Sequence, residues 1–325
     1  MVDKADMEIS SNLNDELKQF LNESDTDVND IDDINFPLYS SVKQQNIKDK
    51  VIFSGGAIKG VALIGVLKAF EIKGLLNNIN TYAGTSVGTV IITLHLLGYT
   101  PDEMFNIVKN FDLEKIKSIS IANLLKLYGL DSGSKLEYVL ERFIVAKQLS
   151  ATITLKEFYV KTKKEFFLAT TCLNTMKAVY LNYKTHPDLP LVKAIRMSIS
   201  VPIFYTPVQH DGKLYVDGGC IDNYPIHIFK DNIDSVIGAY LVESRDHADT
   251  IDNLESCIMS IVNCLMEGVN YNSIKGYEKS TIKINVNAIN IAKYGLSYDE
   301  KKQMFNAGFN QTIDFLKNHN TSVKN

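Results

Sequence analysis

Apolar residues along this chain fall into short runs typical of buried strands, and these alternate with segments of helical periodicity. Residues 51–53 form an apolar run that ends in a small-residue turn, which predicts a buried strand. Residues 60–70 then show apolar positions at helical spacing. A second strand is predicted at 80–83, and helical spacing resumes over 86–98. Two strand–turn–helix units in succession imply parallel strands joined by right-handed crossovers.

The rest of the chain continues this mixture of helices and strands. Residues 101–148 are predicted to be helical throughout. Further strands are expected at residues 165–171, 178–181, near 208, 214–216, 236–241 and 281–286, and further helices at 191–198, 254–269 and 298–316. The sequence contains no internal repeat and no proline-rich linker. The simplest interpretation is one α/β domain that spans residues 36–320.

The first 35 residues differ from the rest in composition. They hold eleven acidic residues against Lys4 and Lys18, a local charge of −9, and they are poor in aromatic residues. Such a segment cannot bury enough apolar surface to offset the entropy lost on ordering. We predict that residues 1–35 are disordered or loosely docked. Apolar residues at helical spacing, such as Leu13 and Leu17, leave open a short amphipathic helix that docks on the domain.

Composition and charge exclude several classes of protein. The chain is 45% hydrophobic and 22% charged, as in globular proteins with a sizeable core. Since the whole chain carries −4, residues 36–325 carry +5, and no dense Lys/Arg run indicates nucleic-acid binding. This mild positive charge favours an anionic lipid surface only weakly.

The expected location is intracellular. The first residues lack the apolar segment of a signal peptide. The longest apolar stretches, 61–67 and 86–99, are shorter than the roughly 20 residues needed to span a bilayer. The four cysteines form no C-x-x-C pair, which favours reduced thiols. These features predict a soluble cytoplasmic or intracellular protein whose membrane contact is peripheral.

A serine stands in the turn between the second predicted strand and its helix. The turn reads G-x-S-x-G, with Ser86 between Gly84 and Gly88. Small residues on either side allow strand and helix to approach closely and hold the hydroxyl out at the helix N-terminus. There the helix dipole stabilises developing negative charge. The alternative is that Ser86 only caps the helix.

The first strand-to-helix turn is rich in small residues and could bind an anion. Its residues are Gly55, Gly56, Ala57, Ile58, Lys59 and Gly60. A phosphate-binding P-loop is disfavoured, because no Ser or Thr follows the lysine. A dinucleotide site is disfavoured too, because Ala57 stands at the second glycine. Backbone N–H groups that form an oxyanion hole fit better, since a nucleophile turn follows some thirty residues later.

A nucleophilic serine requires a base, for which the sequence offers two kinds of candidate. Of the six histidines, His95 is predicted to pack in the core, whereas His227 and His247 remain possible bases. Asp217 follows a short predicted strand and precedes Gly218 and Gly219, which would let another segment approach its carboxylate. On its own, an Asp-Gly dipeptide is more often a simple turn.

Taken together, these motifs resemble the patatin-like phospholipases. The family's glycine-rich first motif is similar to residues 55–60, its nucleophile elbow to residues 84–88, and its third motif, Asp-Gly-Gly/Ala, to residues 217–219. The flanking segments 198–204 and 222–225, and the later Leu296-Ser297 and Ala307-Gly308, are similar to the family as well. The resemblance covers roughly residues 50–317, in order and with fitting spacing.

The resemblance implies a fold and a chemistry. The fold would be a three-layer α/β/α sandwich with a mainly parallel central sheet. Ser86 would attack a lipid or phospholipid acyl ester and form an acyl-enzyme, with Asp217 as the base of a Ser-Asp dyad. The amides of Gly56 and Ala57 would be the main oxyanion donors, and Gly55 would permit the turn. Neither a cofactor nor a metal is expected.

One departure from the family pattern leaves an alternative open. Ala57 stands where the family has its third glycine; at a positive φ an alanine would cost about a kcal/mol and tilt the donor. The competing hypothesis is therefore a weak or inactive lipid-binding protein that retains the fold. Lys59 could lie near a phosphate headgroup or be solvated. Contacts with the acyl chain, or a lid, are expected within residues 101–148.

Overall fold

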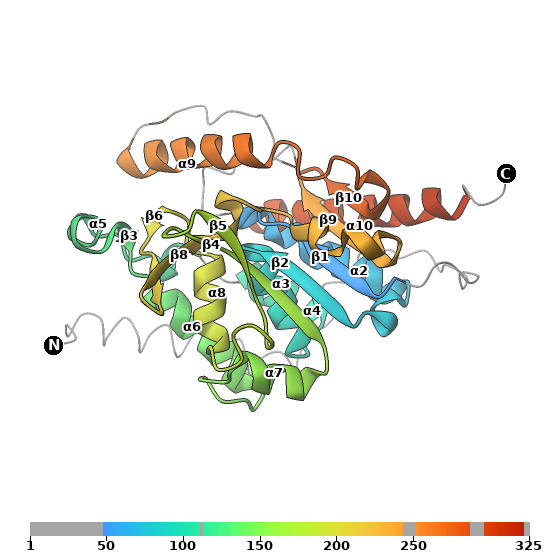
Figure 1. The fold of residues 1–325 in the computed structure, drawn as a ribbon. Coiled ribbons are helices and arrows are strands. Elements are labelled where there is room, and N and C mark those ends of the chain that lie inside the picture. Colours follow the sequence, from blue (N-terminus) through green and yellow to red (C-terminus); the bar gives the residue numbers. More distant parts are fainter. Residues whose placement is uncertain (1–47, 111–112, 243–250, 252, 287–295, 322–325) are drawn as a thin grey trace.

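The computed structural model describes residues 48–321, except for 111–112, 243–250, 252 and 287–295 (Figure 1). The acidic segment 1–35 therefore lies outside the described residues. The strands are β1 (Lys50–Phe53), β2 (Thr81–Thr85), β3 (Gly129–Asp131), β4 (Glu165–Cys172), β5 (Lys177–Leu181), β6 (Ile203–Tyr205), β7 (Val208–His210), β8 (Lys213–Asp217), β9 (Val236–Leu241) and β10 (Thr281–Ile284). The α-helices are α2 (Val61–Ile72), α3 (Val87–Leu96), α4 (Pro101–Asn110), α5 (Ile121–Leu127), α6 (Ser134–Ala146), α7 (Leu155–Thr162), α8 (Leu191–Ser198), α9 (Leu254–Asn270) and α10 (Tyr298–Thr321).

A mixed eight-stranded sheet forms the centre of the fold. Its order is β10-β9-β1-β2-β4-β8-β7, and β5 pairs with β4. The strands β10, β9, β1, β2 and β4 are parallel, whereas β5, β8 and β7 add antiparallel pairs at one end. The sheet is flanked by helices, so the expected α/β architecture with a mainly parallel sheet is confirmed.

Alternate residues of the strands enter different hydrophobic clusters, as side chains on opposite faces of a sheet do. Val51 and Phe53 join the large core formed with α2, α3 and α6. Ile52 and Ala83 instead pack with Tyr224 and with the 3-10 segment η6 (Pro225–Ser235) that follows it. The sheet is thereby buried on both faces, as its continuous apolar strands predicted.

Helices α2 and α10 pack closely because each has a glycine at the contact. A Cβ added at Gly308 would lie 1.9 Å from the Ala62 carbonyl oxygen, and one added at Gly65 would lie 2.0 Å from the Phe305 carbonyl oxygen. Larger residues at these positions would push the helices apart. The α2–α10 pair thereby supports the helix that carries the glycine-rich turn at its N-terminal end.

The prediction that residues 101–148 are helical throughout is wrong at residues 129–131. There the chain forms β3, which pairs in parallel with β6. The preceding helix α5 ends at Tyr128, which has a left-handed φ of 66°. A Cβ at Gly129 would lie 2.3 Å from the Tyr205 carbonyl carbon, so glycine is needed for this pairing. The pairing joins segments more than 70 residues apart, which local periodicity does not reveal.

The ends of β2 and β8 face each other along one edge of β4. Thr85, the last residue of β2, is paired with Ala169, and Asp217, the last residue of β8, is paired with the next residue, Thr170. Since β5 occupies the other edge of β4 over these positions, β2 and β8 share one edge. Their ends therefore face each other, and the residues that follow them are brought together.

None of the helices in the described ranges is long and apolar enough to cross a membrane.

Candidate active site

Ser86 occupies the sharp turn between β2 and α3. Its backbone has φ 51° and ψ −126°, a strained conformation for a residue with a side chain. A Cβ at Gly84 would lie 2.9 Å from the Thr89 nitrogen, and one at Gly88 would lie 2.7 Å from the Phe53 carbonyl oxygen. Both glycines of the G-x-S-x-G motif are thus required by close backbone contacts, and the turn holds its strained geometry because both sides are packed.

A buried serine from α8 holds this turn in place. The Ser86 amide donates to the Ser198 hydroxyl at 3.1 Å, and the Ser198 hydroxyl donates to the Ala169 carbonyl at 2.7 Å. The Thr89 hydroxyl lies 2.9 Å from the Ser198 hydroxyl. Ser198 is fully buried. It therefore links the serine turn to β4, a role that its position at the end of an apolar helix did not reveal in the sequence.

Asp217 stands at the end of β8, fully buried beside Ser86. Its Oδ1 accepts a hydrogen bond from the Gly219 amide at 2.7 Å. Its Oδ2 is buried and has no partner at ordinary hydrogen-bond geometry within the described ranges. Burial raises the pKa of Asp217 to about 6, although the nearby Ser86 hydroxyl and the Gly219 amide favour the ionised form. The carboxylate is thus a stronger base than an exposed aspartate.

Gly218 makes the meeting of the two strand ends possible. A Cβ there would lie 2.5 Å from the Ala169 carbonyl oxygen and 2.9 Å from Thr85 Cγ2. At Gly219, a Cβ would lie 2.4 Å from Met266 Cε of α9. The Asp-Gly-Gly sequence therefore lets the chain pass between β4 and the serine turn and lie directly beneath α9.

The glycine-rich turn lies next to Ser86. A Cβ at Gly55 would approach the Ser86 Cβ to 3.1 Å, and one at Gly60 would lie 2.2 Å from Val87 Cγ2. The Gly55 amide is occupied, because it donates to the Asn223 carbonyl at 3.1 Å. The amides of Gly56 and Ala57 donate no hydrogen bond to any residue in the described ranges. These two amides are therefore available to an incoming acceptor.

Ala57 has the unfavourable conformation that the sequence left open. Its φ is 48°, in the left-handed region. For an L-residue other than glycine, this conformation costs about 1–2 kcal/mol.

Lys59, two residues later, is only 2% exposed, so the interpretation of this side chain as a solvated lysine is wrong.

Two asparagines tie the glycine-rich turn to the Asp-Gly-Gly loop. Asn270, at the end of α9, donates to the Gly219 carbonyl at 2.7 Å and accepts from the Asn223 amide at 2.8 Å. Asn223 in turn accepts the Gly55 amide. Asn270 is buried, and its sequence position in an amphipathic helix gave no sign of this role.

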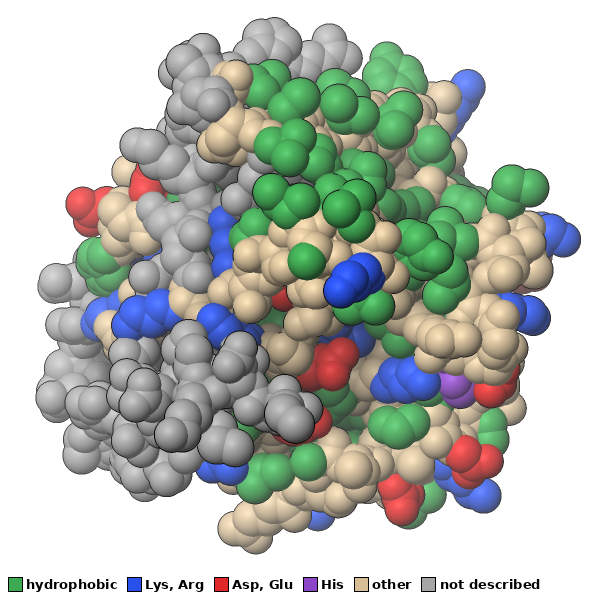
Figure 2. Space-filling view, turned by 90° about the vertical axis from the view of Figure 1, so that its left-hand side faces the viewer, with side chains coloured by type: hydrophobic (Ala, Val, Ile, Leu, Met, Phe, Trp, Pro, Cys, Tyr) green, Lys and Arg blue, Asp and Glu red, His purple; other side chains and the backbone are tan. Residues whose placement is uncertain are grey.

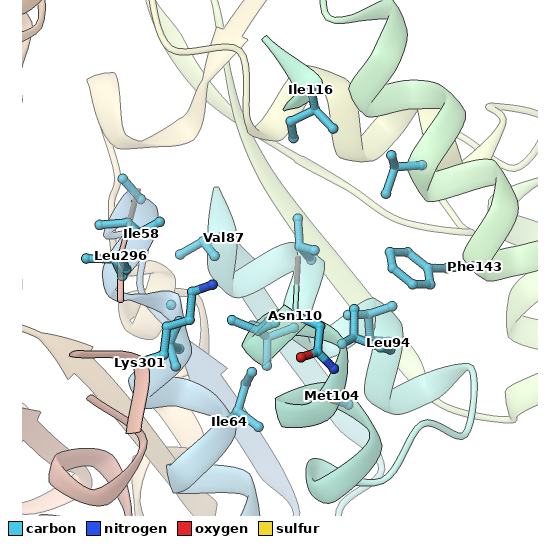
Figure 3. A pocket seen from close by; sticks show the side chains of 18 of the residues that line it. Ile58, Ile64, Val87, Leu94, Met104, Asn110, Ile116, Phe143, Leu296 and Lys301 are labelled. Carbon is cyan, nitrogen blue, oxygen red and sulfur yellow. The ribbon is translucent and has the colours of Figure 1, made fainter. Parts of the chain in front are cut away.

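An apolar cavity of about 610 Å³ opens beside the serine turn (Figure 3). Ala57 and Val87 line it together with side chains of α2, α3, α4 and α6, and Lys301 of α10 lies at one side. Residues 101–148 contribute Met104, Ile107, Val108, Asn110, Ile116, Leu136, Val139, Leu140 and Phe143 to its lining. These side chains come from the segment where the sequence predicted acyl-chain contacts.

His227 and His95 have partners other than Ser86 and Asp217. The Tyr180 hydroxyl lies 3.1 Å from His227 Nε2 and donates to Asp222 at 2.7 Å. His95 lies 3.1 Å from the Tyr82 hydroxyl, and burial lowers the pKa of its imidazole to about 4. His247 lies outside the described residues. In the described ranges, no group of three His, Cys, Asp or Glu side chains is placed to hold a metal ion.

The buried carboxylate predicts a pH-dependent effect on stability. In the unfolded chain Asp217 ionises near pH 3.8, but in the folded protein only near pH 6. Between these values the folded state binds more protons, so the free energy of unfolding falls as the pH rises and then levels off above about 6. Asp217→Asn removes this loss of stability, because asparagine does not ionise. At pH 8 the free energy of unfolding of the variant should exceed that of the parent protein by on the order of 3 kcal/mol.

Urea unfolding of both proteins at pH 4 to 8 measures this difference. It should be small at pH 4, grow up to about pH 6 and stay constant above. Asp188→Asn, at an exposed position, is measured in parallel as the control for replacing an aspartate by asparagine. A difference between Asp217→Asn and the parent that does not change with pH would contradict the raised pKa.

Comparison with known proteins identifies a family profile and several relatives that match this chain. The profile of the patatin-like phospholipase family matches residues 51–230. An uncharacterised protein of Acanthamoeba polyphaga mimivirus is 31% identical over 294 residues, which cover 86% of this chain and 97% of that protein. A probable lipid hydrolase of Invertebrate iridescent virus 6 is 34% identical over 200 residues, covering 59% of this chain and 66% of that protein.

A solved structure shares the fold. The crystal structure of VipD from Legionella pneumophila has a TM-score of 0.55 and 14% sequence identity, covering 86% of this chain and 70% of that chain. The family profile matches more than half of the present chain, across both the serine turn and the Asp-Gly-Gly loop. The chain therefore belongs to the patatin-like phospholipase family and is a lipid-hydrolysing member of the α/β class.

Proposed function

We propose that this protein hydrolyses fatty acyl esters of phospholipids or related lipids through a dyad of Ser86 and Asp217. One observation carries the proposal: a fully buried aspartate with a raised pKa lies beside a serine in a strained turn. An apolar cavity opens beside the same turn. Perturbed carboxylates that face a cavity and a nucleophile are typical of catalytic sites.

In the first half of the reaction, the Ser86 hydroxyl attacks the ester carbonyl and Asp217 accepts its proton. The tetrahedral intermediate carries its negative charge on the former carbonyl oxygen. It collapses to an acyl-serine, and the protonated Asp217 gives its proton to the departing alcohol. In the second half, Asp217 takes a proton from water, which attacks the acyl-serine and releases the fatty acid. The proton then returns to Ser86, and the dyad is restored.

The environment of Asp217 suits this role. An aspartate near its ordinary pKa is a weak base for a serine hydroxyl, and burial moves the pKa about two units closer to neutral pH. The hydrogen bond from Gly219 fixes Oδ1, while Oδ2 remains without a partner of ordinary geometry. Catalytic hydrogen bonds are often long before substrate binds. Oδ2 is therefore the oxygen that we assign to the Ser86 proton.

The amides of Gly56 and Ala57 would stabilise the oxyanion. Both are without acceptors in the described ranges, and Gly55 brings their turn against Ser86. Loss of one such donor elsewhere costs roughly 3–4 kcal/mol of transition-state stabilisation. The left-handed conformation of Ala57 keeps its N–H available at the expense of local strain, which functional sites commonly hold.

The cavity would receive the acyl chain. Its lining is predominantly apolar and includes Ala57, a proposed oxyanion donor, and Val87, the residue after the serine. A chain seated there would place its ester carbonyl at the turn. Because fatty acyl lipids reside in membranes, we also propose that the protein is intracellular and works in peripheral contact with a lipid surface.

The alternative is a weak or inactive lipid-binding protein. The strained Ala57 is the observation that favours it, since a tilted amide would weaken the oxyanion hole. The paired Ser86 and Asp217 oppose it, because a buried carboxylate lowers stability and has no other evident use.

Substitutions in the dyad test the proposal. Ser86→Ala and Asp217→Asn should each lower fatty acid release from phosphatidylcholine by about a thousandfold or more, because nucleophile or base is lost. His227→Ala should retain most of the activity, since that side chain contacts Tyr180 and Asp222. Chromatographic analysis of the released acid and lysolipid measures the rate and reports which ester position is cleaved. If the parent protein releases no fatty acid from any acyl ester, the lipid-binding alternative holds.

Ser198 should act as a positioning residue. Ser198→Ala removes the acceptor of the Ser86 amide, so kcat for a soluble p-nitrophenyl ester should fall roughly ten- to hundredfold with little change in KM. Ser280→Ala is the matched control, because it also removes a buried hydroxyl that donates to a carbonyl. Ser280 directly precedes β10, and strands β9 and β1 separate β10 from β2, which leads to Ser86. Equal losses of kcat in the two variants, or a rise in KM alone, would contradict the positioning role.

A further inference from the structure

Helix α9 has two apolar sides, and only one of them is packed. Val262, Met266 and Asn270, spaced by four residues, face the body of the protein, where Met266 lies over Gly219. On another side of the helix stand large apolar residues that are more than half exposed: Leu254 (57%), Ile261 (54%), Leu265 (66%) and Val269 (58%). Such a stripe on a helix that already has a buried side indicates a second binding partner.

The short helix α5 is even less covered. It has no buried residue at all. Its large side chains are nevertheless apolar and strongly exposed: Ile121 (63%), Leu125 (78%), Leu127 (50%) and the adjoining Tyr128 (65%). In water, a seven-residue helix of this composition gains little from folding unless its side chains are covered.

The two helices belong to one face of the molecule. Helix α9 contacts β6 and the short 3-10 turn η5 (Gly218–Cys220), β6 pairs with β3, and β3 follows α5. In Figure 1, α9 lies across the top and α5 projects on the left. Figure 2 looks onto that left-hand side, and hydrophobic side chains gather over the upper part of it, where α9 lies.

Lysines gather at the α5 end of this face. Residues 115–135, which contain α5, include Lys115, Lys117, Lys126 and Lys135. The acid within that stretch, Asp131, is buried and accepts hydrogen bonds from backbone amides. Glu114 and Glu137 flank the stretch, and α9 itself carries Glu255 and Glu267 and no Lys or Arg, so the positive charge of this face lies at α5. Exposed apolar side chains with lysines among them are the combination that binds the headgroup region of anionic bilayers.

Helix α9 is joined to the candidate active site by hydrogen bonds as well as by the packing of Met266 on Gly219. Asn270, at the C-terminal end of α9, bonds both the Gly219 carbonyl and the Asn223 amide. Gly219 is two residues from Asp217, and Asn223 holds Gly55. A surface that covered α9 would therefore lie at a fixed position relative to Ser86 and Asp217.

We propose that the exposed sides of α9 and α5 form a docking face for an anionic lipid bilayer. Leu254, Ile261, Leu265 and Val269 enter the interfacial region together with the apolar residues of α5, and Lys126 contacts the headgroups. The choice of a bilayer as partner rests on the proposed lipid hydrolase function, because this face adjoins the Asp-Gly-Gly loop. Docking on it would bring the site to the surface that holds the substrate.

Vesicle binding without turnover tests the face directly. The full chain with Ser86→Ala is mixed with sucrose-loaded vesicles of phosphatidylcholine and phosphatidylglycerol, and the bound fraction is measured by sedimentation. Adding Leu125→Ser and Leu265→Ser should weaken binding at least about tenfold, because two inserted apolar side chains are lost. Val160→Ser is the matched control: Val160 is 54% exposed on α7, at the opposite side of Figure 1 from α9, and binding should not change.

Activity in the protein with intact Ser86 gives the second readout. The Leu125→Ser/Leu265→Ser variant should cleave a short soluble ester at the parent rate but hydrolyse vesicle lipid more slowly. Absence of vesicle binding by the Ser86→Ala chain, or binding that the double variant retains, would overturn the proposal. A dimer of this chain would also overturn the proposal, since a second copy would then cover the face. Light scattering would reveal it as a dimer of the Ser86→Ala chain that becomes a monomer after the two leucine substitutions.

The test separates this proposal from the proposed function. If the Ser86→Ala chain binds vesicles through this face while the intact protein hydrolyses no ester, the docking face stands and the hydrolase function fails. If the intact protein hydrolyses esters but the face does not bind vesicles, the hydrolase function stands and the docking face fails.

Discussion

The whole site depends on the meeting of β2 and β8 along one edge of β4. Because Thr85 pairs with Ala169 and Asp217 pairs with Thr170, two strands that run in opposite directions end facing each other. The turn after β2 presents Ser86, and the last residue of β8 is the carboxylate itself. Gly84, Gly88 and Gly218 are required there because backbones pass within contact distance of one another. The geometry of the dyad is thus fixed by sheet pairing and close packing rather than by flexible side chains.

Burial at this point has opposite consequences for stability and for chemistry. It raises the pKa of Asp217 to about 6, which destabilises the folded protein at neutral pH and makes the carboxylate a stronger base. The strained turns at Ser86 and Ala57 add to this local cost. Extensive packing elsewhere, including the close contact of α2 with α10, keeps these residues in place. A site that lowers stability in this way is expected where function, not folding, has determined the residues.

Local signals in the sequence predicted most strands, most helices and the turn that carries Ser86, since each depends on neighbouring residues. Asp217 could be singled out only through the family resemblance, because an Asp-Gly-Gly sequence alone reads as a turn. The roles of Ser198 and Asn270 were not predicted, although Ser198 lies in a segment similar to the family; their hydrogen bonds join segments 112 and 51 residues apart. The strand β3 was missed for the same reason, as its pairing with β6 is distant in sequence. The sequence likewise could not show that Ala57 has a positive φ, which follows from how the turn packs on Ser86.

The central claim is that Ser86 is the nucleophile and that Asp217, with a pKa near 6, is its base. The most direct measurement is the rate at which a fluorophosphonate labels the protein between pH 4.5 and 8, with the labelled peptide identified by mass spectrometry. We expect one label, on Ser86, and a rate that rises with pH and levels off above about 6, with Asp217→Asn nearly unreactive at every pH. Labelling at another residue, or labelling of Ser86 that Asp217→Asn leaves unchanged, would contradict the dyad.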